Sequence, residues 1–243
     1  MARRTAAAVA AAVGALAVMC GVGLTTHITE TSDVPALVAF GAPASLPLGL
    51  DPHDARQVIT VVAESTTAAT AQLQAWEHGP DGWVRMGHPV IAHVAEDGLT
   101  PHPRENYSAT PLGDYTLTQA FGKLPDPGTV MPYIHVTTAD WWISQPGPLY
   151  NTHQFCTLAC PFTLGSPNTH LVDAIRAYNY AVAIDYNRFP AAPGAGSAYF
   201  LHVTTAGKPT RGCIAIPQRD MIAILRWLNP SDAPRIMIGL AQN

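Results

Sequence analysis

Two short apolar segments joined by a polar loop constrain the fold of this chain more than any other feature. Residues 199–204 alternate between two sets of side chains and are rich in β-branched and aromatic residues, which is typical of a strand. Residues 214–216, Ile-Ala-Ile, indicate a second, buried strand. The loop between them is short enough for the two strands to form a hairpin, which would place the imidazole of His202 beside the thiol of Cys213.

A histidine beside a cysteine is the minimum apparatus for a thiolate nucleophile. Gly212 lets the backbone approach a substrate, and we expect its amide to be free to meet an oxyanion. The positive charge of Arg211, two residues from the sulfur, favours the thiolate over the thiol. A single cysteine or strand histidine is more often a core residue, but together these features favour a cysteine enzyme.

The segment Thr210-Arg211-Gly212-Cys213 resembles the catalytic motif of the YkuD-type L,D-transpeptidases, in which a histidine precedes a Ser/Thr-His-Gly-Cys segment. Thr210 matches the Ser/Thr, Gly212 the glycine, Cys213 the nucleophile and His202 the base. Residues 110–115, Thr-Pro-Leu-Gly-Asp-Tyr, resemble the family's Thr-Pro-x-Gly-x-aromatic segment, and Tyr186-Asn187 is similar to actinobacterial members. The resemblance covers residues 56–239.

The resemblance implies a mostly β fold, a YkuD-like β-sandwich with one or two short helices. It implies an enzyme that forms 3→3 crosslinks between peptidoglycan stem peptides through a thioacyl intermediate on Cys213, and that carbapenems acylate. The backbone carbonyl of Val203 would orient His202, with the Asp185 side chain ranked second, and neither metal nor organic cofactor is needed. The expected site residues are the catalytic pair Cys213 and His202, the motif and oxyanion residues Thr210, Arg211, Gly212 and Val203, and the substrate-binding Tyr186, Asn187 and Phe200.

Two departures from the family pattern keep other functions open. Arg211 stands where the usual motif has histidine, and Ala215 stands where asparagine or arginine is common. One alternative is a cysteine carboxypeptidase or endopeptidase that hydrolyses wall peptides, because transfer and hydrolysis differ in how the acceptor cleft excludes water. The other is a catalytically silent wall-binding protein on the same fold.

The N-terminus predicts export. Basic residues at Arg3 and Arg4 precede an apolar run, so residues 1–25 are expected to be a signal peptide or an uncleaved membrane anchor. This charge order places the rest of the chain outside the cytoplasm, in a wall or periplasm-like space. Residues 26–54 are rich in proline and small residues and are predicted to be a linker, which leaves 55–243 as the catalytic domain.

Within that domain, short segments at close spacing predict a mostly antiparallel β fold. The expected strands are 58–62, 72–76, 90–94, 115–118, 180–186 and 235–238, with a helix over 217–228 and a short helix over 170–177. Trp141 and Trp142 are explained equally well by a peptide groove and by core packing.

Cysteine usage and charge restrict the partners. Cys156 and Cys160 are predicted to form a disulfide, which leaves Cys213 unpaired in an oxidising compartment. His88 and His93 lack a third ligand at useful spacing, so no metal site is predicted. Nearly half of the 243 residues are apolar, which is enough to form a hydrophobic core. The net charge is −4 and only two lysines occur, so nucleic acid is excluded as a partner.

Overall fold

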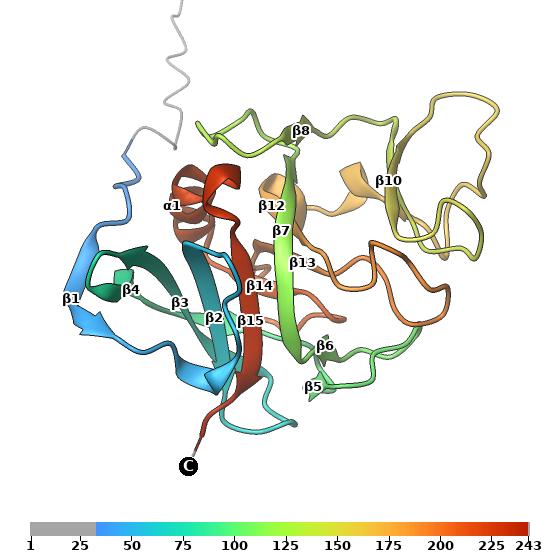
Figure 1. Cartoon of the computed structure of the whole chain (residues 1–243). Helices are drawn as coiled ribbons and strands as arrows, with labels where there is room; N and C mark the ends of the chain where they lie inside the picture. Colours follow the sequence, from blue (N-terminus) through green and yellow to red (C-terminus); the bar gives the residue numbers. More distant parts are fainter. Residues whose placement is uncertain (1–32, 243) are drawn as a thin grey trace, which may run out of the picture. The chain divides into compact units, whose positions relative to one another are not determined.

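The computed structural model describes residues 33–242, and its centre is one ten-stranded sheet with the strand order β1-β4-β14-β13-β12-β7-β15-β2-β3 and with β8 added beside β7. Because β3 pairs with β4 as well as with β2, the strands from β4 to β3 close on themselves. These strands (Figure 1) are β1 Ala39–Ala44, β2 Gln57–Ala63, β3 Thr70–Gly79, β4 Gly82–His93, β7 Gly113–Gly122, β8 Tyr133–His135, β12 Ala181–Ile184, β13 Phe200–Val203, β14 Ile214–Ile216 and β15 Arg235–Leu240.

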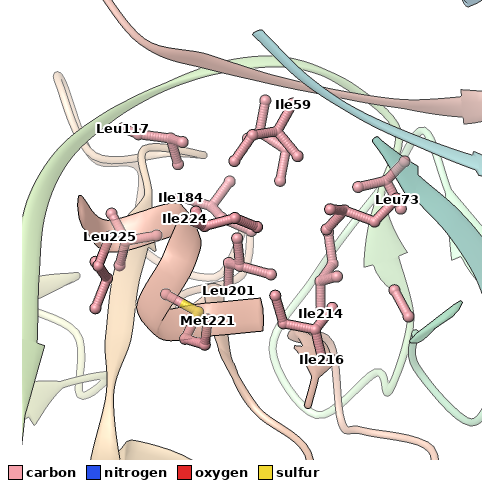
Figure 2. Packing of buried hydrophobic residues seen from close by; sticks show 14 of the residues in the cluster. Ile59, Leu73, Leu117, Ile184, Leu201, Ile214, Ile216, Met221, Ile224 and Leu225 are labelled. Atoms are coloured by element: carbon pink, nitrogen blue, oxygen red, sulfur yellow. The ribbon is translucent and has the colours of Figure 1, made fainter. Parts of the chain in front are cut away.

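The main core lies between this sheet and the helix α1, Gln218–Trp227. Five consecutive residues of α1, 221–225, are buried in the cluster that also contains the inward-facing side chains of the strands. Because five residues exceed one helical turn, this part of α1 is covered on more than the side that faces the sheet. Figure 2 shows this contact, with the labelled side chains Ile59, Leu73, Leu117, Ile184, Leu201, Ile214, Ile216, Met221, Ile224 and Leu225. The mostly β fold with a short helix is therefore confirmed.

A second, smaller layer covers the outer face of β12 and β13. It contains the three-stranded sheet β10-β9-β11, with β9 at Asp140–Ile143, β10 at Thr152–Phe155 and β11 at Thr169–His170. Trp142 of β9 packs with Phe121 of β7 and Phe200 of β13 in a separate apolar cluster. The small sheet thus covers one face of the main sheet. The remaining two-stranded sheet pairs β5, Leu99–Thr100, with β6, Thr110–Pro111.

The six strands and the main helix expected from periodicity are present, but two local predictions are wrong. The chain over 170–177 is not a continuous helix; one 3₁₀ turn covers Leu171–Asp173 and a second, Ala177–Asn179, begins only after a bend at residues 174–176. The strands β13 and β14 also do not form a hairpin, because they pair in parallel. The loop between them therefore runs back along the sheet before β14 begins.

The second half of the linker expected over 26–54 has secondary structure and packs on the domain. β1 pairs antiparallel with β4, and a 3₁₀ turn follows at Pro47–Gly49. Leu46, Leu48 and Leu50 pack against the buried cluster that contains Val58, Trp76 and Met237. This apolar contact explains why the segment docks on the domain instead of extending away from it. The first half of the predicted linker up to residue 32, and the whole of 1–25, lie outside the described residues. Across residues 33–242 no helix has the length and hydropathy to cross a bilayer.

The packing of α1 predicts a large loss of stability when its core face is truncated. We expect Leu225→Ala to lower the free energy of unfolding by about 2–5 kcal/mol, because the fully buried side chain leaves a cavity between helix and sheet. Urea denaturation followed by tryptophan fluorescence measures the change. Ile91→Ala is the control, because Ile91 is 62% exposed and its truncation should cost only about 0.5 kcal/mol. Equal losses in the two variants would contradict this packing.

Candidate active site

The parallel pairing of β13 and β14 places His202 and Cys213 on the same face of the main sheet. Leu201 is opposite Ile214 in the register, and His202 is opposite Ala215. Leu201 and Ile214 both belong to the main core. Since successive side chains of a strand point to opposite faces, His202 and Cys213 lie on the outer face, where Cys213 packs in the cluster beneath the small sheet.

Tyr178 contacts this face from the 3₁₀ turn that precedes β12. Its ring lies 5.6 Å from the imidazole of His202 and 5.5 Å from the ring of Phe200, in both cases edge to face. The same tyrosine lines a pocket with Cys213. A residue that the sequence analysis did not single out therefore connects the two predicted catalytic residues.

His202 is held by a backbone carbonyl, as expected. Its Nδ1 lies 2.8 Å from the carbonyl oxygen of Val203. A carbonyl oxygen only accepts hydrogen bonds, so Nδ1 carries the proton and Nε2 retains a free lone pair. Burial lowers the pKa of His202 from 6.5 to about 4, although the bond to Val203 acts in the opposite direction. The neutral imidazole is therefore the resting form at neutral pH.

Asp185, the second choice for orienting His202, serves another purpose. Its carboxylate accepts hydrogen bonds from Thr116 at 2.7 Å and from Thr118 at 3.1 Å on β7. It also pairs with the buried Arg188 at 2.6 Å. These contacts fasten the end of β12 to its neighbour and leave the carbonyl of Val203 as the partner of His202.

Cys213 is a free, half-buried thiol whose proton is directed away from the solvent. Its Sγ donates to the carbonyl of Ala198 at 3.4 Å. Burial raises the pKa of Cys213 from 9.0 to about 12, and a backbone hydrogen bond with Phe200 opposes this only in part. The prediction that Arg211 favours the thiolate is not supported, because this exposed side chain does not offset the burial of the sulfur. The resting pair is a thiol and a neutral imidazole.

The turn before Cys213 requires a glycine. Gly212 has φ of +149°, and a Cβ there would lie 2.6 Å from Cε1 of Tyr199. The hydroxyl of Thr210 donates to the carbonyl of Cys213 at 2.5 Å and accepts from the amide of Gly212 at 3.2 Å. The expectation of a free Gly212 amide is therefore wrong in this structure, and Thr210 instead fixes the turn that presents the sulfur.

A pocket of about 360 Å³ opens over Cys213. Its walls come from the loop 104–108, from the end of the small sheet and from the motif turn. His202 does not line this pocket, and only 7% of its surface is exposed. The lining residues are Arg104, Glu105, Asn106, Tyr107, Ser108, Ser166, Pro167, Thr169, Tyr178, Ser197, Ala198, Tyr199, Arg211, Gly212 and Cys213.

The three residues expected to contact substrate do not line this pocket. The hydroxyl of Tyr186 donates to the carbonyl of Ala195 at 2.7 Å. The side-chain amide of Asn187 bonds the carbonyls of Ala192 and Gly196. Phe200 is fully buried in the second cluster. Tyr186 and Asn187 thus shape the loop that leads to β13, and Phe200 supports the face that carries Cys213.

Asn151 is a positioning residue that the sequence analysis missed. Its Oδ1 accepts from the indole of Trp142 at 2.9 Å and from the amide of Ala198 at 3.1 Å. Its amide group donates to the carbonyls of Tyr186 and Asn187 at 3.1 and 2.8 Å. Asn151 therefore holds Ala198, the thiol's hydrogen-bond acceptor, against the small sheet. A single asparagine in a loop carries no periodic or motif signal.

The layer that contains the small sheet also contains the predicted disulfide between Cys156 and Cys160. Both cysteines pack against Trp141, Ile143 and Phe162. Trp141 and Trp142 are buried, so core packing, and not an exposed groove, accounts for them. Within residues 33–242 no cluster of three or more His, Cys, Asp or Glu side chains is arranged to hold a metal ion.

The raised pKa of Cys213 predicts a distinctive pH profile for its alkylation. Because the thiolate fraction grows about tenfold per pH unit below the pKa, we expect the iodoacetamide rate to rise without a plateau from about pH 6 to about pH 9. Peptide mapping by mass spectrometry measures the rate at Cys213 specifically. A plateau beginning near neutral pH would instead indicate a preformed thiolate–imidazolium pair.

The contact between Gly212 and Tyr199 predicts the effect of a methyl group. We expect Gly212→Ala to slow Cys213 alkylation and turnover by about 100-fold, because the sulfur moves when the turn shifts. Gly147→Ala is the matched control, because Gly147 has a similar φ of +142° and nothing within 4 Å of the added Cβ. Both variants should lose stability through backbone strain, but only Gly212→Ala should lose reactivity. Equal reactivity in the two variants would contradict the assigned contact.

Comparison with known proteins gives a match to a protein family. No curated protein and no solved structure matches the chain significantly. Residues 58–238 match the YkuD family, described as the L,D-transpeptidase catalytic domain. This match spans most of the chain and includes every site residue named above. The chain therefore belongs to the YkuD family of L,D-transpeptidase catalytic domains.

Proposed function

We propose that this L,D-transpeptidase is an exported cysteine acyltransferase that forms 3→3 crosslinks between peptidoglycan stem peptides. The observation that carries the proposal is the arrangement of His202 and Cys213 on one sheet face, with the sulfur at the wall of the pocket. The family match supports peptidoglycan peptides as the substrate class. The residues supply an acid–base group and a nucleophile without a cofactor.

The reaction begins from the neutral pair. As Sγ of Cys213 attacks a donor peptide carbonyl, the thiol proton passes to the free Nε2 of His202. The C–N bond then breaks, and His202 returns this proton to the leaving amine, which is D-alanine in the family's reaction. The product is a thioester on Cys213. An acceptor amine attacks the thioester carbonyl and gives its proton to His202, the C–S bond breaks, and the sulfur recovers a proton from His202.

The negative oxygen of the tetrahedral intermediate needs a hydrogen-bond donor. The Gly212 amide already contacts Thr210 at 3.2 Å, so the Cys213 amide takes the main role in the proposal. Such a donor contributes about 3 kcal/mol to transition-state stabilisation. Burial keeps both catalytic groups neutral at rest. The low dielectric of the buried site also strengthens the hydrogen bond to the negative oxygen.

Export is part of the proposal. The Cys156–Cys160 disulfide supports it, because structural disulfides persist in oxidising compartments. The basic and apolar N-terminal sequence is the segment that would direct or anchor the chain.

Covalent modification tests the nucleophile. We expect incubation with a carbapenem to give one adduct, located on Cys213 by intact-mass and peptide analysis. Cys213→Ala should form no adduct and lose all turnover, because the remaining cysteines of the described residues are joined in a disulfide. A tetrapeptide donor with an amine acceptor then separates transfer from hydrolysis by product mass.

Each other outcome identifies a different function. Turnover by Cys213→Ala would refute the mechanism. A tripeptide product without a crosslink would favour the carboxypeptidase. Absence of any adduct, combined with binding to the wall peptide, would favour the silent wall-binding protein that the departures at Arg211 and Ala215 keep open.

A further inference from the structure

The pocket above Cys213 contains one carboxylate, that of Glu105. This half-buried side chain lines the pocket, and its Oε1 accepts a hydrogen bond of 2.5 Å from the hydroxyl of Tyr150. Tyr150 is only 2% exposed, so it is a fixed support. The backbone of Glu105 is held as well, because its amide donates to the carbonyl of Gly194 at 3.2 Å. The position of the carboxylate is therefore set from two sides.

No cation of residues 33–242 forms an ion pair with Glu105. Two guanidinium groups line the same pocket, those of Arg104 and Arg211. The guanidinium of Arg104 lies over the ring of Tyr107, 4.6 Å from its centre. Arg211 is exposed. A half-buried carboxylate with a fixed position and no internal counter-ion is suited to a cationic ligand.

The side chain of Tyr199 lies near both Glu105 and the sulfur of Cys213. A Cβ at Gly212, next to Cys213, would meet the side of the Tyr199 ring, whereas a Cβ at Gly196 would meet its hydroxyl at 2.8 Å. The Tyr199 ring therefore extends from the motif turn toward the loop that holds Glu105. Burial is the main cause of the raised pKa of Tyr199, and the neighbouring groups Tyr186, Cys213 and Glu105 raise it further. Cys213 and Glu105 thus flank a single side chain within one pocket.

We propose that Glu105 binds the ammonium group of a peptide substrate while the peptide is positioned over Cys213. The inference rests on the proposed function, because it assigns the specificity of the same site. Tyr150 acts as a positioning residue that leaves the second carboxylate oxygen available to the ligand. The ammonium belongs either to the donor peptide during acylation or to the acceptor before it loses its proton, and the experiment separates the two sources.

The test compares two tetrapeptide donors that differ only at one side-chain amine, which is free in one and acetylated in the other. In the wild-type protein the free-amine donor should acylate Cys213 about 10- to 100-fold faster, the range expected for one hydrogen bond to a charged group. In Glu105→Gln, which keeps an acceptor for Tyr150, the ratio of the two rates should fall to about 1. Glu96→Gln is the control, because Glu96 is exposed and does not line the pocket.

A second arm measures the acceptor. If the ammonium comes from the acceptor, Glu105→Gln should leave the donor ratio unchanged and slow aminolysis of the thioester about 10- to 100-fold. If Glu105→Gln, with a thermal midpoint equal to that of the wild type, changes neither the donor ratio nor the aminolysis rate, the inference is overturned.

Failure of the proposed function gives a different result. In that case the wild-type protein is acylated by no donor. Calorimetric binding of the two peptides is then compared in Cys213→Ala with and without Glu105→Gln. Preference for the free amine that disappears in the double variant supports the ammonium site, and equal binding overturns it.

Discussion

The parallel, in-register pairing of β13 and β14 is the constraint on which the site depends. It commits Leu201, Val203, Ile214 and Ile216 to the main core, and it therefore turns His202 and Cys213 outward together. A shift of one residue in either strand would exchange the two faces and bury one of the pair in the core. The packing of α1 against the inward residues therefore also specifies where the chemistry occurs.

Burial sets the protonation state of the pair. The small sheet and Tyr178 cover the outer face, and the resulting loss of hydration favours the uncharged forms of His202 and Cys213. Cys213 is thus held as a thiol that donates to the carbonyl of Ala198. This arrangement protects the sulfur from adventitious reaction, since the thiolate is the reactive species. In the proposed mechanism, the transfer of the thiol proton to His202 is therefore part of the chemical step.

Structural elements could be predicted from the sequence where the pattern of apolar residues or the spacing of cysteines was compatible with only one local structure. Short apolar and β-branched runs predicted β2, β12 and β15, helical spacing predicted α1, and cysteine spacing predicted the disulfide. The pairing direction of β13 and β14 was not predictable, because the intervening loop is long enough for a hairpin or a return along the sheet. The docking of residues 39–50 was hidden by their prolines, although Leu46, Leu48 and Leu50 carried the signal. The neutral resting pair and the part played by Asn151 arise from segments distant in sequence, which local patterns do not reveal.

The closure of the main sheet has a consequence for association between molecules. Since β3 pairs with both β2 and β4, most backbone hydrogen-bonding groups of the described strands already have neighbours within the sheet. β1 lies outside the closed path, on the outer side of β4, where it carries Pro43 and an irregular register between Phe40 and Ala44. A proline without an amide proton and a distorted ladder make this strand a poor template for a second chain. The architecture thereby discourages the growth of β-sheets between molecules.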